Sequence, residues 1–326
     1  IIRMSKNIFI SGHNGMVGSS IKRRIEKDYP HYNLILRSKK ELNLLNQADV
    51  NDFFTSNKID AIYFAAAKVG GILANSSHPY EFLYENMTIQ SNLINAAIKN
   101  NIKKILFLGS SCIYPKTSKQ PIKEEYLLSG HLEDTNEAYA LAKISGIKLC
   151  ESANIEFGLD YRCLMPTNLY GPGDIFDLEK SHVLPALIRK FVEAKEMNKK
   201  EVILWGSGKP RREFLHVDDL ASAALYFMEM PKEEFWKNNM NKFSQVNIGT
   251  GKDIPIIELA DLISNLVKYN GSIKLDMEKP DGMSQKLLDI SKASNLGWNA
   301  TISLEDGLKN TINWFIKNKD SDLIRK

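Results

Sequence analysis

Residues 7–18 have the sequence NIFISGHNGMVG, and they set the architecture that we expect for the rest of the chain. The apolar run at 7–10 predicts a short buried strand, and apolar residues at helical spacing over 19–27 predict a helix. Between them stand Gly12, Gly15 and Gly18. A dinucleotide-binding loop needs a tight turn, close approach of its backbone to the pyrophosphate and close helix-to-strand packing, and glycines serve all three. The spacing is GxxGxxG, a variant of the usual pattern, and a plain glycine turn is the alternative.

Strand and helix patterns alternate as far as residue 172. Strands are expected at 33–36, 61–67, 104–108 and 160–165, with helices at about 48–56, 81–100 and 138–157 between them. This order predicts an α/β fold, a Rossmann-type doubly wound parallel sheet, over 1–172. The alternation then breaks, so 173–326 is expected to form mainly a smaller, mixed α/β substrate-binding domain. Parts of it, about 212–250, are expected to fold back onto the first domain, and the polar segment 231–243 is expected to be a surface loop.

Composition narrows the class of protein. Apolar residues make up 43% of the 326 residues and charged residues 25%, which is ordinary for a soluble globular protein. The net charge of +4 comes without a dense basic run, which argues against nucleic acid as a partner. No apolar run reaches the roughly 20 residues of a membrane span. A β-like run follows residues 1–6 at once, so they are not expected to be a signal peptide.

The three cysteines indicate the compartment. Cys112, Cys150 and Cys163 form no CxxC pair and no disulfide framework spacing. This pattern favours a reducing, cytoplasmic location and predicts no structural metal site. Cys150 and Cys163 stand inside apolar stretches and are expected in the core.

Cations follow the second predicted strand, in the sequence Arg37-Ser38-Lys39-Lys40. A site for NAD would present Asp or Glu here to the ribose hydroxyls. Arg37 and Lys39 instead suit the 2′-phosphate of NADP(H), because guanidinium and ammonium groups bind phosphate. A basic loop without a role is the alternative.

Tyr139 and Lys143 are four residues apart in a predicted helix, so their side chains share one face. An ammonium beside a phenol favours the phenolate, so we expect the pKa of Tyr139 to be lowered from about 10. Such a phenol can donate a proton to a carbonyl oxygen as hydride reaches the carbon.

Ser110, Ser111 and Cys112 follow a strand directly, at the sheet edge where ligands bind in this kind of fold. A solvated helix and a serine turn are the alternatives.

Together these residues resemble the extended short-chain dehydrogenase/reductases that act on nucleotide sugars, and within them the GDP-L-fucose synthases. The resemblance covers nearly the whole chain, from residue 8 to about 315. Its longest matching stretches are AAAKVGGI at 65–72, FLGSSCIYPK at 107–116, MPTNLYGP at 165–172, WGSG at 205–208, REFLHVDD at 212–219, and the segments 279–282 and 286–289.

The resemblance implies roles for five residues. Ser110 would hydrogen-bond the C4 carbonyl of the substrate, beside Tyr139 and Lys143. Cys112 and His182 match the residues that act as acid and base in two epimerisations. The chemistry is reasonable, because a C4 ketone acidifies the protons at C3 and C5, and thiol and imidazole pKa values bracket neutrality.

The resemblance also implies binding residues and an assembly. For the cofactor NADP(H) they are Gly12, Asn14, Gly15, Met16, Val17, Gly18, Arg37, Lys39, Leu44, Ala65, Ala66, Leu108, Gly109, Ser110, Tyr139, Lys143, Pro166, Asn168, Leu169 and His182. For the GDP-sugar they are Ser111, Cys112, Asn168, Lys190, Trp205, Arg212 and Asp281. A homodimer is implied, formed by two helices of each subunit, those over 81–100 and 139–157.

Three departures from the family pattern keep more than one function open. Asn14 stands where an arginine is often found, the segment 173–176 is unusual, and Gln285 replaces a frequent basic residue. The leading hypothesis is an NADPH-dependent 3,5-epimerase and 4-reductase of a GDP-4-keto-6-deoxy sugar, acting in nucleotide-sugar biosynthesis for surface polysaccharide. The first alternative is a C4 reductase of a GDP-4-keto-heptose, with epimerisation left to another enzyme. The second is an inactive nucleotide-binding protein of the same fold.

Overall fold

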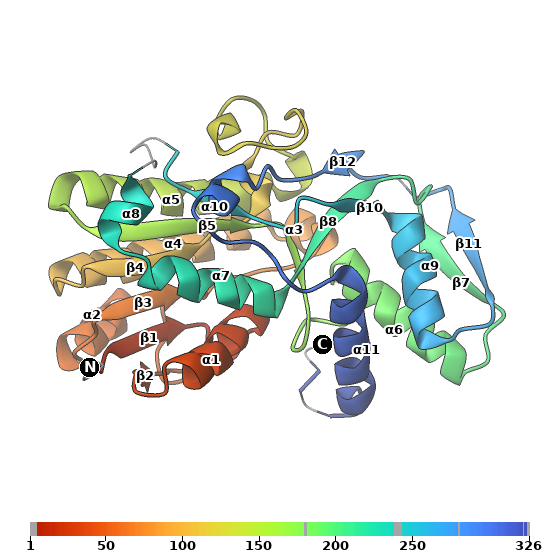
Figure 1. Ribbon diagram of the computed structural model, residues 1–326, viewed down its shortest axis with the longest axis horizontal. Coiled ribbons are helices and arrows are strands. Elements are labelled where there is room, and N and C mark those ends of the chain that lie inside the picture. Colours follow the sequence, from red (N-terminus) through yellow and green to blue (C-terminus); the bar gives the residue numbers. More distant parts are fainter. Residues whose placement is uncertain (1–4, 179–180, 238–242, 280, 322, 325–326) are drawn as a thin grey trace.

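A parallel six-stranded sheet forms the centre of the protein (Figure 1). The computed structural model describes residues 5–178, 181–237, 243–279, 281–321 and 323–324. The strand order is β2-β1-β3-β4-β5-β9, and the pairings are parallel. The strands are β1 (Asn7–Ser11), β2 (Asn33–Ile35), β3 (Ala61–Phe64), β4 (Lys104–Leu108), β5 (Asp160–Pro166) and β9 (Val246–Ile248). From β1 the chain winds outward first to β2 and then the other way to β3, β4 and β5, which confirms the predicted doubly wound sheet.

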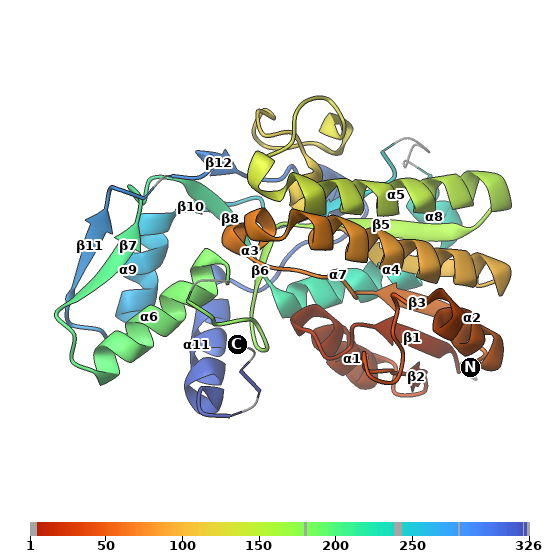
Figure 2. The same ribbon diagram turned by 180° about the vertical axis from the view of Figure 1, so that it is seen from behind.

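Helices cover both faces of this sheet. They are α1 (Met16–Asp28), α2 (Gln47–Ser56), α3 (Ile72–Ser77), α4 (Pro79–Lys99), α5 (Glu137–Phe157), α7 (Val217–Glu229), α8 (Lys232–Trp236) and α10 (Ser291–Asn295). Figure 1 shows α1, α7 and α8 on one face, and Figure 2 shows α2, α4 and α5 on the other. Alternation along β1 explains the two layers: Ile8 and Ile10 pack toward α1 and α7, and Phe9 packs toward α2. Each face therefore has its own apolar core.

The remainder is a smaller, mixed part, as predicted. Its four-stranded sheet contains β6 (Asn168–Tyr170), β8 (Arg211–His216), β10 (Asp253–Pro255) and β12 (Gln285–Lys286), with both parallel and antiparallel pairs. A two-stranded sheet joins β7 (Glu201–Trp205) to β11 (Ser272–Asp276). The helices α6 (Val183–Glu196), α9 (Ile256–Val267) and α11 (Leu304–Asn318) enclose a third apolar core. The exact division of the chain into two domains at residue 172 stays a prediction.

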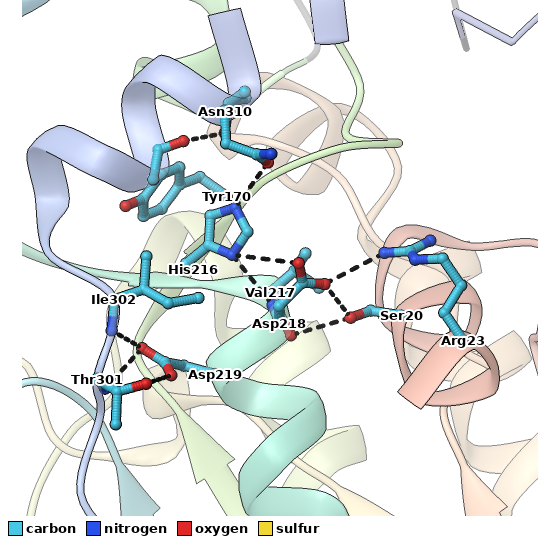
Figure 3. Close-up of polar contacts among 12 residues, drawn as sticks. Ser20, Arg23, Tyr170, His216, Val217, Asp218, Asp219, Thr301, Ile302 and Asn310 are labelled. Atoms are coloured by element: carbon cyan, nitrogen blue, oxygen red, sulfur yellow. Dashed lines mark hydrogen bonds and ion pairs between the residues drawn. The ribbon is translucent and has the colours of Figure 1, made fainter. Parts of the chain in front are cut away.

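A buried histidine joins the two parts (Figure 3). His216 ends β8, and its Nδ1 accepts a hydrogen bond from the backbone N–H of Asp218 at 3.2 Å. Its Nε2 therefore carries the ring proton and faces Asn310 Oδ1 of α11 at 3.3 Å. The Asp218 carboxylate accepts from Ser20 Oγ of α1 at 2.6 Å. The helix that follows the glycine loop is thus tied to the C-terminal helix through His216 and Asp218.

One expected loop contains a helix. The segment 231–243 includes α8, whose Phe235 is fully buried, while residues 238–242 lie outside the described residues. The reason is long-range: the guanidinium of Arg162 lies 4.5 Å from the Phe235 ring centroid, and Trp236 Nε1 donates to Asp160 at 2.9 Å. Polar residues around these two aromatic anchors gave the segment a loop-like composition. Within the described part of the chain, none of the helices is long and apolar enough to cross a membrane.

Candidate active site

The glycine loop lies against the end of β3. Gly12 has φ +77°, and a Cβ there would lie 2.8 Å from the backbone N of Ala66. A Cβ on Gly18 would lie 2.2 Å from the carbonyl oxygen of Gly12. Both positions therefore require glycine. Gly15 precedes α1, so the N-terminus of this helix faces the same edge as the loop and can bind an anion.

The end of β2 presents the two predicted cations. Arg37 donates to the carbonyl of Leu36 at 2.8 Å and lies 5.6 Å from the ring centroid of Phe53, while Lys39 is exposed. Glu41 accepts hydrogen bonds from the backbone N–H and the hydroxyl of Ser38, both at 2.7 Å, and this closes the turn. Arg37 and Lys39 thus follow β2 at the same sheet edge as the glycine loop.

Tyr139 and Lys143 lie in the first turns of α5, beside the end of β4. Lys143 is only 4% exposed, and its Nζ donates to the Leu108 carbonyl at 2.8 Å. The same Nζ lies 5.7 Å from the Tyr139 ring centroid and 5.0 Å from that of Phe107. Burial lowers the pKa of Lys143 to about 8, and the nearby Cys112 partly opposes that shift.

The expected lowering of the Tyr139 pKa is wrong for the chain alone. Burial raises the pKa of Tyr139 above its usual value, and the neighbouring Cys112 raises it further. Sequence spacing placed the ammonium on the correct face but could not reveal that Lys143 bonds a carbonyl instead of the phenol. Tyr139 is therefore a protonated phenol at neutral pH, which is the form that can donate a proton.

Ser110 and Cys112 are placed by a short 3₁₀ turn, Ser111–Ile113, directly after β4. Ser110 precedes the turn, and its Oγ accepts a hydrogen bond from the backbone N–H of Cys112 at 3.3 Å. Burial raises the pKa of the Cys112 thiol, while Lys286, Ser110 and Lys143 act to lower it. The thiol therefore shares one environment with the hydroxyl and the ammonium that the sequence singled out.

His182 immediately precedes α6, in the smaller part of the protein. His182 as a whole residue is exposed to solvent, yet the surrounding protein lowers the pKa of its imidazole, first through loss of hydration and then through the charge of Lys286. Lys286 also influences Cys112, and burial lowers the pKa of Lys286 itself. A cation thus lies within electrostatic reach of both His182 and Cys112. Lys286 stands in the matching stretch 286–289, but its role was not predictable, because a single lysine in a two-residue strand gives no local signal.

A second group of residues lies further along the smaller part. Lys190 Nζ lies 5.0 Å from the Trp205 ring centroid, and the ring is 54% exposed. Arg212 of β8 donates to the Met283 carbonyl at 2.6 Å. Asp281 accepts from the N–H and Oγ of Ser207, at 2.8 and 2.6 Å, and lies against Gly206, which follows Trp205. Lys279 Nζ also lies 5.3 Å from the Trp205 ring centroid, so a partly exposed aromatic ring is grouped here with two ammonium groups and a carboxylate.

The remaining predicted residues lie at the carboxyl ends of the central strands or in the loops, turns, helix starts and short strand that directly follow them. Asn168 donates to the Glu213 carbonyl at 2.8 Å, and Asn92 donates to the Leu44 carbonyl at 2.9 Å. The others are Asn14, Met16, Val17, Ala65, Ala66, Leu108, Gly109, Ser111, Pro166 and Leu169. Within the described ranges, no group of three His, Cys, Asp or Glu residues could hold a metal ion.

Comparisons with known proteins agree on one family. The model of the NAD dependent epimerase/dehydratase family matches residues 8–249. The GDP-L-fucose synthase of Escherichia coli (strain K12) is 54% identical over 318 residues, which are 97% of this chain and 99% of that protein. The GDP-L-colitose synthase of Yersinia pseudotuberculosis is 42% identical over 97% of this chain and 99% of its own. The crystal structure of a GDP-6-OMe-4-keto-L-xylo-heptose reductase from C. jejuni matches with a TM-score of 0.91 at 37% identity, covering 97% of this chain and 99% of that one.

Proposed function

Because the chain belongs to the NAD dependent epimerase/dehydratase family, we propose that it is an NADPH-dependent enzyme of GDP-4-keto-6-deoxy sugars. It epimerises the sugar at C3 and C5 and then reduces the C4 ketone, as the GDP-L-fucose synthases do. The observation that carries the proposal is the grouping of Ser110, Cys112, Tyr139 and Lys143 around the end of β4. The 54% identity over nearly the full length supports the same substrate class.

NADP(H) is the proposed cofactor, and it supplies the hydride when bound. The residues present fit such a group. Without side chains, Gly12 packs against the backbone of Ala65 and Ala66 and Gly18 packs against that of Gly12, which gives the tight loop that a dinucleotide requires, and α1 directs its N-terminus to that edge. Arg37 and Lys39 at the end of β2 match the extra phosphate of NADP(H) in charge.

Reduction at C4 uses the protonated phenol. Tyr139 donates its proton to the C4 oxygen, and Ser110 donates a hydrogen bond to the same oxygen. The Lys143 ammonium stabilises the phenolate that results. Its anchor on the Leu108 carbonyl keeps it within 5.7 Å of the Tyr139 ring. The nearby ammonium therefore lowers the free-energy cost of forming the Tyr139 phenolate, although burial raises the pKa of the free phenol.

Epimerisation uses Cys112 and His182. The raised pKa of Cys112 and the lowered pKa of His182 leave both groups neutral at pH 7. The pair then starts with one proton donor and one proton acceptor, as inversion of a carbon next to a ketone requires. Lys286 lies near both and stabilises the thiolate whenever the thiol gives up its proton.

A Tyr139→Phe substitution tests the proposal. NADPH oxidation with GDP-4-keto-6-deoxy-mannose, followed by absorbance, is expected to fall at least about a hundredfold, in line with the loss of a general acid. NADPH affinity, measured by fluorescence quenching, is expected to fall far less than turnover, because Tyr139 is only one of the predicted cofactor contacts. Turnover at the unchanged rate in this variant would refute the catalytic assignment, and absence of turnover in the unmodified protein would favour the inactive nucleotide-binding alternative.

The second candidate function is C4 reduction alone, on a GDP-4-keto-heptose. It is favoured by the TM-score of 0.91 with a heptose reductase and by Gln285. The side-chain amide of Gln285 donates a hydrogen bond to Asp253 Oδ2 at 2.6 Å. Under this alternative Cys112 and His182 would position the sugar without exchanging protons.

We also propose a cytoplasmic homodimer formed by α4 and α5 of each subunit. These helices pack side by side on one face of the sheet, as Figure 2 shows. Tyr80 and Tyr84 of α4 are 73% and 53% exposed with stacked rings, Met87 continues the same stripe, and Leu141 and Leu149 are exposed on α5. Light scattering after size-exclusion chromatography is expected to give twice the 37.0 kDa of one chain. A monomer mass would refute the dimer.

A further inference from the structure

Glu213 is a fully buried carboxylate in the smaller part of the protein. It follows Arg212 in β8, with its side chain turned into the protein interior. One oxygen, Oε1, accepts hydrogen bonds from the backbone N–H groups of Thr250 and Gly251, both at 2.7 Å. The other, Oε2, accepts from the N–H of Leu288 at 3.0 Å. No side chain of the described residues pairs a positive charge with it; backbone dipoles replace its hydration.

A charge in this position is expensive unless its hydrogen bonds are complete. The three N–H donors act against the rise in the pKa of Glu213 that burial causes. Gly249 supplies the space, since a Cβ there would lie 2.3 Å from Oε1. An apolar side chain of similar size would leave the buried N–H groups of Thr250, Gly251 and Leu288 without an acceptor, so the carboxylate stabilises the segments to which they belong.

Those segments carry residues of the proposed site. Leu288 comes two residues after Lys286, which pairs in register with Arg212 across β12 and β8. The turn 249–251 leads from β9 into β10, the strand on the other side of β8. The backbone carbonyl of Glu213 accepts from Asn168 Nδ2 at 2.8 Å. Glu213 thus contacts the segment after β5, the turn after β9 and the segment that contains β12.

We propose that Glu213 is a positioning residue, which fixes Lys286 and Arg212 relative to Asn168 by holding three backbone segments together. That this positioning matters for turnover rests on the proposed function. The positioning of the three segments does not depend on that function, and it can be tested by ligand binding and amide hydrogen exchange without any reaction.

The substitution Glu213→Gln changes the hydrogen bonding of one carboxylate oxygen and preserves that of the other. The amide oxygen can still accept from Thr250 and Gly251, so the amide NH₂ is left facing the Leu288 N–H, donor against donor. The segment containing β12 is therefore released selectively. Affinity for GDP, measured by calorimetry, is expected to weaken about tenfold, the size of one lost hydrogen bond with an unsatisfied partner. NADPH affinity is expected to change less than about twofold, and amide exchange over 285–289 is expected to speed up.

Glu151→Gln is the matched control. Glu151 is also a buried carboxylate, and one of its oxygens accepts from both the N–H and the Oγ of Ser244, at 3.1 and 2.9 Å, away from β12. It is expected to leave GDP affinity and exchange over 285–289 unchanged. If Glu213→Gln fails to fold, the variant Gly249→Ala takes its place in the same measurements. The added methyl group would lie against Glu213 Oε1 and displace the carboxylate.

Exchange over 285–289 that is as slow in Glu213→Gln as in the unmodified protein would overturn the positioning role, as would equal losses of GDP and NADPH affinity. If the unmodified protein does not bind GDP at all, the proposed function fails. The exchange data alone then decide the role of Glu213.

Discussion

Replacing Lys143 by Met should change how stability depends on pH in a predictable direction. The ammonium is 4% exposed, and its pKa falls from the ordinary 10.5 to about 8 on folding. Between these values the unfolded chain binds more protons than the folded one, so stability rises as pH increases through this window. Met fills a similar volume and does not titrate, which removes this contribution.

The magnitude follows from the two pKa values. From pH 7.5 to pH 9.5 the buried lysine should add about 2 kcal/mol to the free energy of unfolding, by integration of the proton-binding difference. Loss of the bond to the Leu108 carbonyl gives an offset of about 1–3 kcal/mol that does not vary with pH. Only the pH-dependent difference between the two proteins is therefore diagnostic.

Urea unfolding of both proteins at the two pH values provides the assay. Subtracting the variant also cancels Lys292, whose pKa burial likewise lowers to about 8. The expected result is that the unmodified protein gains about 2 kcal/mol over the variant at the higher pH. An unchanged difference, or a gain for the variant, would refute the conclusion that Lys143 is a desolvated ammonium.

Three further predictions test other parts of the molecule. Replacing both Arg37 and Lys39 by Ala should weaken NADPH binding about tenfold or more and leave NADH binding nearly unchanged; equal losses for both would contradict the 2′-phosphate assignment. Arg162→Leu should lower the free energy of unfolding by about 3–5 kcal/mol, because Asp160 loses two hydrogen bonds of 2.7 Å; adding Asp160→Asn should restore part of it in urea titrations. The rate of solvent proton exchange at C3 should not fall as the pH is lowered to 6.5, because burial and Lys286 lower the pKa of His182 below that value. A decrease in the rate that begins at or above pH 6.5 would count against His182 as the neutral base.

The sequence was sufficient for the elements that depend on local pattern. The glycine loop, the alternation of strands and helices, and the helix of Tyr139 and Lys143 all have periodicities that a single chain displays. Such patterns cannot show pairing between distant segments. A short strand is predictable over 245–249, but its pairing with β5, which ends 80 residues earlier, is not, and β12 is only two residues long and has no signal of its own.

The electrostatics of the site were harder to predict for the same reason. The pKa direction of Tyr139 depends on burial and on which group the Lys143 ammonium bonds, and both are set by packing. Lys286 became a candidate only when the structure placed it near Cys112 and His182. In the sequence, Glu213 is one charged residue among many. Only the structure shows that it is buried and accepts hydrogen bonds from two separate backbone segments.

The central claim is that one site both epimerises and reduces a GDP-4-keto-6-deoxy sugar. Reaction of the purified protein with GDP-4-keto-6-deoxy-mannose and NADPH in D₂O, followed by NMR, tests it most directly. Deuterium at C3 and C5 of a product reduced at C4 is the predicted result, with Cys112 and His182 exchanging the protons. Reduction at C4 without deuterium at those carbons would contradict the claim and favour a reductase that acts on a GDP-4-keto-heptose.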